Sequence, residues 1–203
     1  MKVSLPPFAI LFATAAAGSA LAAAPEPVRP VAPDLYSGRW YEVARTPNAR
    51  QADCARDTID FAGRVTGKLS VVQTCNKTAG GSPATYKASA TVLPNNANAK
   101  IKLNFFGGFI TQEYWIVDHA DDGAWAIMAT PAGHYVWLLS RRPELAPQTR
   151  VQAVARLKAL GFNTANLRYD QAPQTASAAR GAGPASAARE TLADEGSYHH
   201  GPR

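Results

Sequence analysis

The chain has 203 residues, of which 46% are hydrophobic and 18% are charged, and this length suits one domain with extra segments. Its formal net charge of +6 comes from 21 basic and 15 acidic residues. The basic residues are scattered and form no run, which argues against a nucleic-acid partner and for an ordinary solvated surface.

The first 24 residues have the order of a secretory signal. Lys2 precedes an apolar run over residues 8–17, and small residues follow it. The run is too short for a convincing membrane span. We predict a signal peptide over residues 1–24 and a linker over 25–33. No Cys stands near the expected cleavage site, so the mature protein is expected to be exported, periplasmic or secreted, soluble and without a lipid anchor.

The C-terminal segment has the composition of a disordered tail. Residues 173–203 consist mainly of Ala, Ser, Gly, Pro and charged residues without a sustained apolar period. We therefore predict disorder over this range. His199 and His200 could hold a metal weakly, but adjacent histidines in a tail are more often only part of the tail. No metal and no cofactor are expected.

Short strand-like segments recur between Trp40 and Arg141, separated by turn residues and without a long helical period. Eight strands joined by hairpin-length links predict an all-β, antiparallel up-and-down barrel. Pro147 and Gly161 are plausible limits of one amphipathic helix, which should pack outside the barrel. Residues 167–169 could add a ninth strand. The eight predicted strands cover residues 40–45, 58–61, 68–75, 86–93, 100–106, 113–117, 125–130 and 135–141.

Two cysteines in an exported chain suggest one disulfide between Cys54 and Cys75. If a hairpin turn is centred between Arg64 and Val65, directly opposed residues have numbers that sum to 129, as 54 and 75 do. The two sulfurs would then face each other across the ladder. Two free thiols or a Cys bonded to a partner are the alternatives.

Trp40 opens the first predicted strand and Arg141 closes the last, so both can meet at one end of the barrel. There the indole would plug the floor and the guanidinium would stack over it, a contact of about 1–2 kcal/mol when shielded from water. The alternative is an ordinary buried Trp and an ordinary surface Arg.

Four motifs in this order resemble those of the lipocalins, and within them the bacterial lipocalins and their apolipoprotein D-like relatives. The resemblance covers about residues 34–172, which we take as the barrel domain. It implies reversible binding and carriage or storage of a lipophilic small molecule, of the fatty acid or lysophospholipid class, in the cell envelope. The motifs occupy residues 38–45, 104–109, 114–118 and 135–143.

Side chains alternate along a strand, so one inward residue determines the others. This rule assigns inward positions on the first, fifth and last strands, and the resemblance assigns the faces of the rest. Glu42 and Tyr114 would orient a polar head group, and the small alanines would leave the barrel hollow. The expected ligand-binding residues are Glu42, Ala44, Ala88, Ala90, Leu103, Phe105, Tyr114, Ile116, Ala126, Met128, Trp137 and Leu139.

Two other functions stay open at this point. An enzyme is disfavoured because the chain has no Gly-x-Ser-x-Gly elbow, no HExxH and no CxxC, so no catalytic residue is expected. A structural barrel with a filled core, whose tail recruits partners, is the second alternative. Transient contact with a membrane surface is a further expectation, and the sequence identifies no protein partner.

Overall fold

A computed structural model describes residues 23–63, 68–94 and 96–170 of the chain. The predicted disordered tail lies outside these ranges, and so does nearly all of the predicted signal peptide. Among the described residues, no helix combines the length and the apolar character that crossing a membrane requires.

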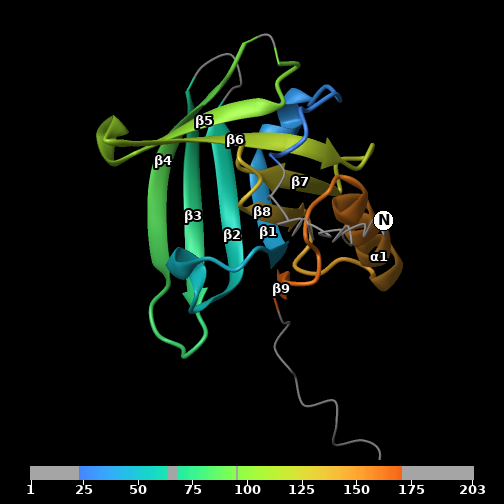
Figure 1. The fold of residues 1–203 in the computed structure, drawn as a ribbon. Coiled ribbons are helices and arrows are strands. Elements are labelled where there is room, and N and C mark those ends of the chain that lie inside the picture. The colour runs from blue at the N-terminus through green and yellow to red at the C-terminus, as the bar shows by residue number, and fades with distance from the viewer. Residues whose placement is uncertain (1–22, 64–67, 95, 171–203) are drawn as a thin grey trace, which may run out of the picture. The chain divides into compact units, whose positions relative to one another are not determined.

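Eight antiparallel strands close into a barrel, which confirms the predicted fold (Figure 1). Each strand from β1 to β7 pairs with the next one, and β1 also pairs with β8, so the sheet has no free edge between them. A ninth strand extends the sheet beside β1. The strands are β1 Gly38–Arg45, β2 Cys54–Gly63, β3 Leu69–Lys77, β4 Ala84–Val92, β5 Lys100–Phe105, β6 Ile110–His119, β7 Trp125–Ala129, β8 Val136–Ser140 and β9 Arg168–Tyr169.

One α-helix, α1 (Pro147–Ala159), packs against the outside of the barrel, as predicted. Pro147 suits the first helical turn, where its missing N–H costs no hydrogen bond. Ala153 and Leu157 are fully buried and join outward-facing strand residues in a second apolar core. Three short 3₁₀ helices complete the described fold: η1 Pro33–Tyr36, η2 Ala49–Gln51 and η3 Phe106–Gly108.

A β-bulge in β1 reverses the inward and outward alternation of this strand. Glu42 pairs with Leu139 but Ala44 pairs with Leu138, so Val43 is an extra residue on the bulged strand. Ala44 therefore lies in the outer core beneath the helix. The expectation that Ala44 lines the cavity is wrong, because it assumed unbroken alternation.

Trp40 closes one end of the barrel. Its indole is buried and donates a hydrogen bond from Nε1 to the carbonyl of Leu35, at 2.9 Å. The guanidinium of Arg141 stacks over the ring, with its central carbon 3.8 Å from the centroid. Arg141 also donates hydrogen bonds to the carbonyls of Ser37 and Asp34, and so ties β8 to the turn that precedes β1.

Residues 25–33, expected to form a linker, lie against the barrel. Arg29 forms an ion pair with Asp118 at 3.0 Å. Val31 is buried, and its N–H donates a hydrogen bond to the carbonyl of Ala97. The segment that precedes the barrel is therefore fastened to it before η1 begins.

Candidate ligand-binding cavity

The barrel contains a cavity of about 650 Å³. This volume lies within the range of roughly 300–1,000 Å³ that is typical of small-molecule sites. Aliphatic and aromatic side chains line its deep part, including Phe61, Val71 and Ile101. The loops that follow β1, β5 and β7 contribute to its mouth, because consecutive antiparallel strands bring alternate loops to the same end.

Half of the twelve expected ligand-binding residues line this cavity. They come from strands β1, β5, β6, β7 and β8, which shows that strand alternation held for most of the barrel. These residues are Glu42, Leu103, Phe105, Tyr114, Met128 and Trp137.

The other expected residues occupy three different places. Ala88 and Ala90 on β4 pack against the interior core without lining the cavity, and Ala44 lies outside the barrel. A separate void of only about 10 Å³ beside Trp40 is too small for a ligand. The remaining three residues line this void: Ile116, Ala126 and Leu139.

Gln51 fastens the η2 turn to the cavity wall, a contact that the sequence analysis did not foresee. Its Nε2 donates hydrogen bonds to Oε2 of Glu42 at 2.7 Å and to Oδ2 of Asp57 at 2.8 Å. Its Oε1 accepts hydrogen bonds from Nε1 of Trp137 and Nδ2 of Asn48. The amide thus uses all of its donors and two acceptor positions, which fixes the turn firmly.

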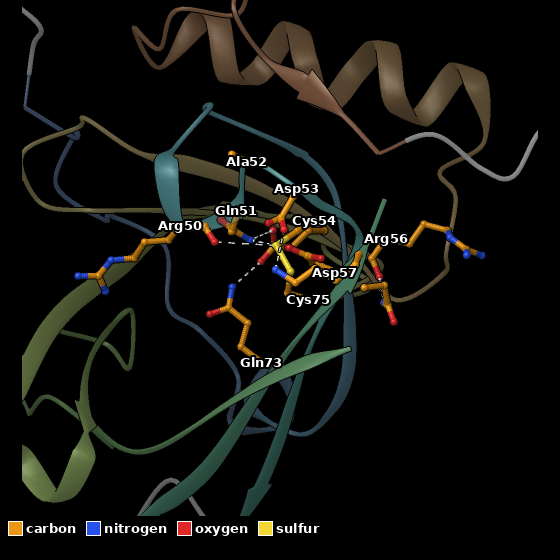
Figure 2. Close-up of a disulfide and its surroundings, with 12 residues drawn as sticks. Arg50, Gln51, Ala52, Asp53, Cys54, Arg56, Asp57, Gln73 and Cys75 are labelled. Atoms are coloured by element: carbon orange, nitrogen blue, oxygen red, sulfur yellow. Dashed lines mark hydrogen bonds and ion pairs between the residues drawn. A yellow bond between two sulfur atoms is a disulfide. The ribbon is translucent and has the colours of Figure 1, made fainter. Parts of the chain in front are cut away.

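The predicted disulfide between Cys54 and Cys75 is confirmed, and it holds the start of β2 against β3 next to η2 (Figure 2). The two Cα atoms are 5.1 Å apart. The hairpin register behind the prediction is wrong, however, because Cys54 lies opposite Lys77. The pair nearest the turn, Gly63 with Leu69, already departs from the predicted register, and a bulge at Arg56, which has a φ of 51°, shifts the register by one residue between the cysteines.

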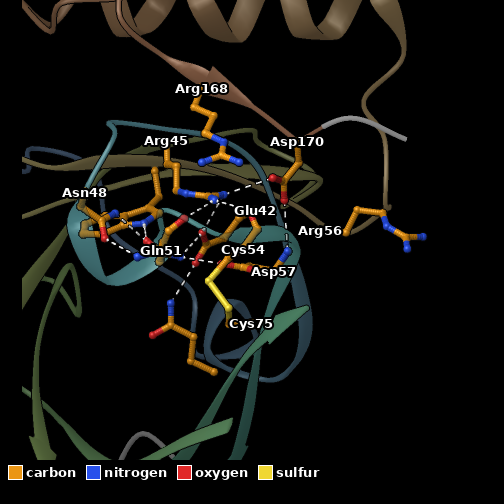
Figure 3. Close-up of polar contacts among 12 residues, drawn as sticks. Glu42, Arg45, Asn48, Gln51, Cys54, Arg56, Asp57, Cys75, Arg168 and Asp170 are labelled. Carbon is orange, nitrogen blue, oxygen red and sulfur yellow. Dashed lines mark hydrogen bonds and ion pairs between the residues drawn. A yellow bond between two sulfur atoms is a disulfide. The ribbon is translucent and has the colours of Figure 1, made fainter. Parts of the chain in front are cut away.

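Four buried charged residues gather behind the η2 turn (Figure 3). Nη1 of Arg45 donates a hydrogen bond to Oδ1 of Asp170 at 3.1 Å and lies 3.7 Å from Oε2 of Glu42. Oδ2 of Asp170 accepts a hydrogen bond from the N–H of Asp57. Of this cluster, sequence analysis identified only Glu42; Arg45 lay in a recognised motif without an assigned role.

This cluster has more carboxyl groups than cations, which changes the protonation of Glu42. Burial raises the pKa of Glu42 to about 8, and the charge of Asp57 adds to this rise, whereas Arg45 opposes it. Burial also raises the pKa of Asp57. At neutral pH the Glu42 carboxyl is therefore mainly protonated, so the cavity wall is polar here but carries little charge.

Comparison with known proteins agrees with the barrel and its cavity. Residues 33–172 match the family model for the lipocalin-like domain. The chain is 27% identical over 150 residues to outer membrane lipoprotein Blc of Vibrio cholerae, covering 72% of this chain and 88% of that protein. It is 28% identical over 145 residues to temperature-induced lipocalin-1 of Arabidopsis thaliana, covering 66% and 75%.

Solved structures share the fold at lower identity. Insecticyanin from the tobacco hornworm Manduca sexta superposes with a TM-score of 0.62 at 16% identity, covering 75% of this chain and 88% of that chain. The family model covers most of the chain, including the barrel, α1 and the buried cluster around Glu42. The chain therefore belongs to the lipocalin family, whose bacterial members it resembles.

Proposed function

We propose that this protein reversibly binds and carries or stores a single-chain lipid, of the fatty acid or lysophospholipid class. Family membership supports the coarser statement that it binds and transports small hydrophobic ligands. The observation that carries the proposal is the cavity of about 650 Å³, lined deep inside by aliphatic and aromatic residues. This volume favours a carrier over a structural barrel with a filled core.

The apolar lining gives the proposal a quantitative consequence. Burial of each methylene contributes about 0.8 kcal/mol, which corresponds to about a fourfold change in affinity. Association costs reduce the total but are nearly the same for ligands that differ only in chain length. Affinity should therefore rise with acyl chain length until the tail fills the deep part of the cavity.

We also propose that the protein acts outside the cytoplasm, as a periplasmic or secreted protein without a lipid anchor. The disulfide between Cys54 and Cys75 supports this location, because disulfides persist mainly in oxidising compartments. The predicted leader over residues 1–24 supports export.

Displacement of a fluorescent fatty-acid probe by saturated fatty acids of 10 to 18 carbons tests the carrier function. We expect binding to tighten by roughly an order of magnitude for each two added carbons before it levels off. Trp137→Ala should weaken binding, because Trp137 lines the cavity. Trp125→Ala is the matched control, since Trp125 packs in the outer core.

If Trp137→Ala and Trp125→Ala both fold and bind the fatty acids with equal affinity, the ligand site lies elsewhere. No displacement at any chain length would refute the carrier function. Multiple-turnover product formation from lipid esters would instead favour the enzyme alternative.

A further inference from the structure

Arg50 places a guanidinium at the mouth of the cavity. It belongs to η2, lines the cavity and is solvent-exposed. Among the described residues, no carboxylate forms an ion pair with it and no acceptor takes a hydrogen bond from its side chain. The barrel fold itself makes no evident use of this charge.

The backbone that directly follows Arg50 is held rigidly. Gln51 is anchored to Glu42 and Asp57, and Cys54 is bonded to Cys75. In Figure 2 the Arg50 side chain points away from the disulfide. A cation on a fixed turn loses less freedom on binding a ligand than one on a mobile loop.

The charge of Arg50 acts on another residue of the cavity wall. Arg50 counteracts part of the rise in pKa that burial imposes on Tyr114, so its charge reaches the Tyr114 hydroxyl on β6. Both residues line the cavity. An anion held by Arg50 would therefore lie at the mouth of the cavity.

The polar inner wall behind Gln51 favours one orientation of an amphiphile in the cavity. Behind Gln51, the carboxyl groups of Glu42, Asp57 and Asp170 share a single guanidinium, that of Arg45. A carboxylate or phosphate placed there would lose water without a cation to pair with, because the Arg45 guanidinium is already bonded to Asp170. An apolar tail in the deep cavity meets no such cost.

We propose that Arg50 binds the anionic head group of a single-chain lipid at the mouth while the tail extends inward, so that the cavity selects anionic over neutral amphiphiles. This inference rests on the carrier function proposed above and names its ligand class. The planar guanidinium can form two parallel hydrogen bonds to a carboxylate or a phosphate. Arg50 is then a specificity-determining residue of the site.

Three probes of equal chain length test this inference: oleate, oleoyl lysophosphatidic acid and oleyl alcohol. Arg50→Ala should weaken binding of at least one anionic probe about tenfold, as expected for a charge-assisted hydrogen bond at an accessible site. It should change oleyl alcohol binding less than twofold. Arg50→Lys should recover part of the lost affinity, because it keeps the charge but not the paired donors.

Arg150→Ala is the matched control, because it removes the same charge from an exposed position on α1, outside the barrel. This control should bind all three probes like the parent. The anionic probe that loses more affinity with Arg50→Ala identifies a carboxylate or a phosphate as the preferred head group. Thermal melting of each variant should match the parent, since the Arg50 side chain is exposed and is paired with none of the described residues.

Equal losses for oleate, lysophosphatidic acid and oleyl alcohol would overturn the inference, because Arg50 would then act on the tail or the turn. Unchanged binding of both anions would overturn it as well. If the parent protein binds none of the three probes, the carrier function itself fails, which is a separate result.

Discussion

Replacing Glu42 by Gln should remove a pH dependence of stability that the buried cluster creates. Gln keeps the shape of the protonated carboxyl but cannot ionise. Burial and Asp57 raise the pKa of Glu42 from its ordinary value of 4.5 to about 8 in the folded protein. The groups that face this carboxyl are Asp57 and Asp170, which favour the proton, and Arg45, which opposes it.

The sign of the effect follows from proton binding. Below pH 4.5 the carboxyl is protonated in both states, whereas between 4.5 and 8 the folded protein keeps a proton that the unfolded chain has released. Stability of the parent protein therefore falls as pH rises through this window. The full difference amounts to about 5 kcal/mol, and about 3 kcal/mol of it should develop between pH 5 and pH 8.

Urea unfolding followed by tryptophan fluorescence at pH 5, 6, 7 and 8 measures this difference. The free energy of unfolding of Glu42→Gln minus that of the parent should increase as pH rises. This difference should be largest at pH 8. Other titrating groups contribute to both proteins and largely cancel in the comparison. Parallel pH profiles would refute the reasoning, because Glu42 would then be ionised in the folded protein as it is in the unfolded chain.

Three further variants test the closed end, the disulfide and the buried cluster. Trp40→Ala should lower the free energy of unfolding by about 3–5 kcal/mol, so a variant with the parent's thermal midpoint would contradict the plugged floor. The pair Cys54→Ser and Cys75→Ser should cost about 3 kcal/mol in urea unfolding; reduction of the parent with dithiothreitol should give the same loss. Asp170→Ala leaves a buried guanidinium without its hydrogen-bonded carboxylate and should cost about 3 kcal/mol. The control Asp121→Ala breaks an exposed ion pair and should lower the free energy of unfolding by less than about 1 kcal/mol. If Asp170→Ala and Asp121→Ala lose the same free energy of unfolding, the buried cluster does not stabilise the fold as argued.

Regular alternation explains why most of the barrel could be predicted from the sequence. On β5, Ile101 and Leu103 face inward between outward Lys100 and Lys102, and the structure follows this pattern. The turn residues between the strands limited the connections to hairpins, so an up-and-down barrel was the simplest closed arrangement.

A bulge accounts for the error in strand β1, and a misplaced hairpin turn accounts for the error in strand β2. An extra residue at Val43 turns Ala44 outward. On β2, Gly63 pairs with Leu69, so opposed residue numbers beside the turn sum to 132 instead of the predicted 129, and the bulge at Arg56 changes this sum by only one. The bulge in β1 leaves no mark in the sequence pattern, because Val43 and Ala44 are both apolar. Strand alternation therefore could not reveal this bulge, and it does not fix the centre of a turn either.

The polar part of the site could not be predicted because its contacts join distant segments. Arg45 and Asp170 are 125 residues apart in the sequence yet share a buried hydrogen bond. Periodicity indicates which face a residue occupies but not which partner it meets. Gln51 and Arg50 lie in the short helix η2 between β1 and β2, where strand alternation does not apply.

The plugged floor has a kinetic consequence for the cargo. Trp40 and Arg141 close the barrel at one end, and the residues that line the deep part are buried, so the described cavity is a dead end. A new molecule cannot push the old one out through the far side. Exchange must wait for the first occupant to leave by the entrance, and its rate should not depend on the concentration of the incoming competitor.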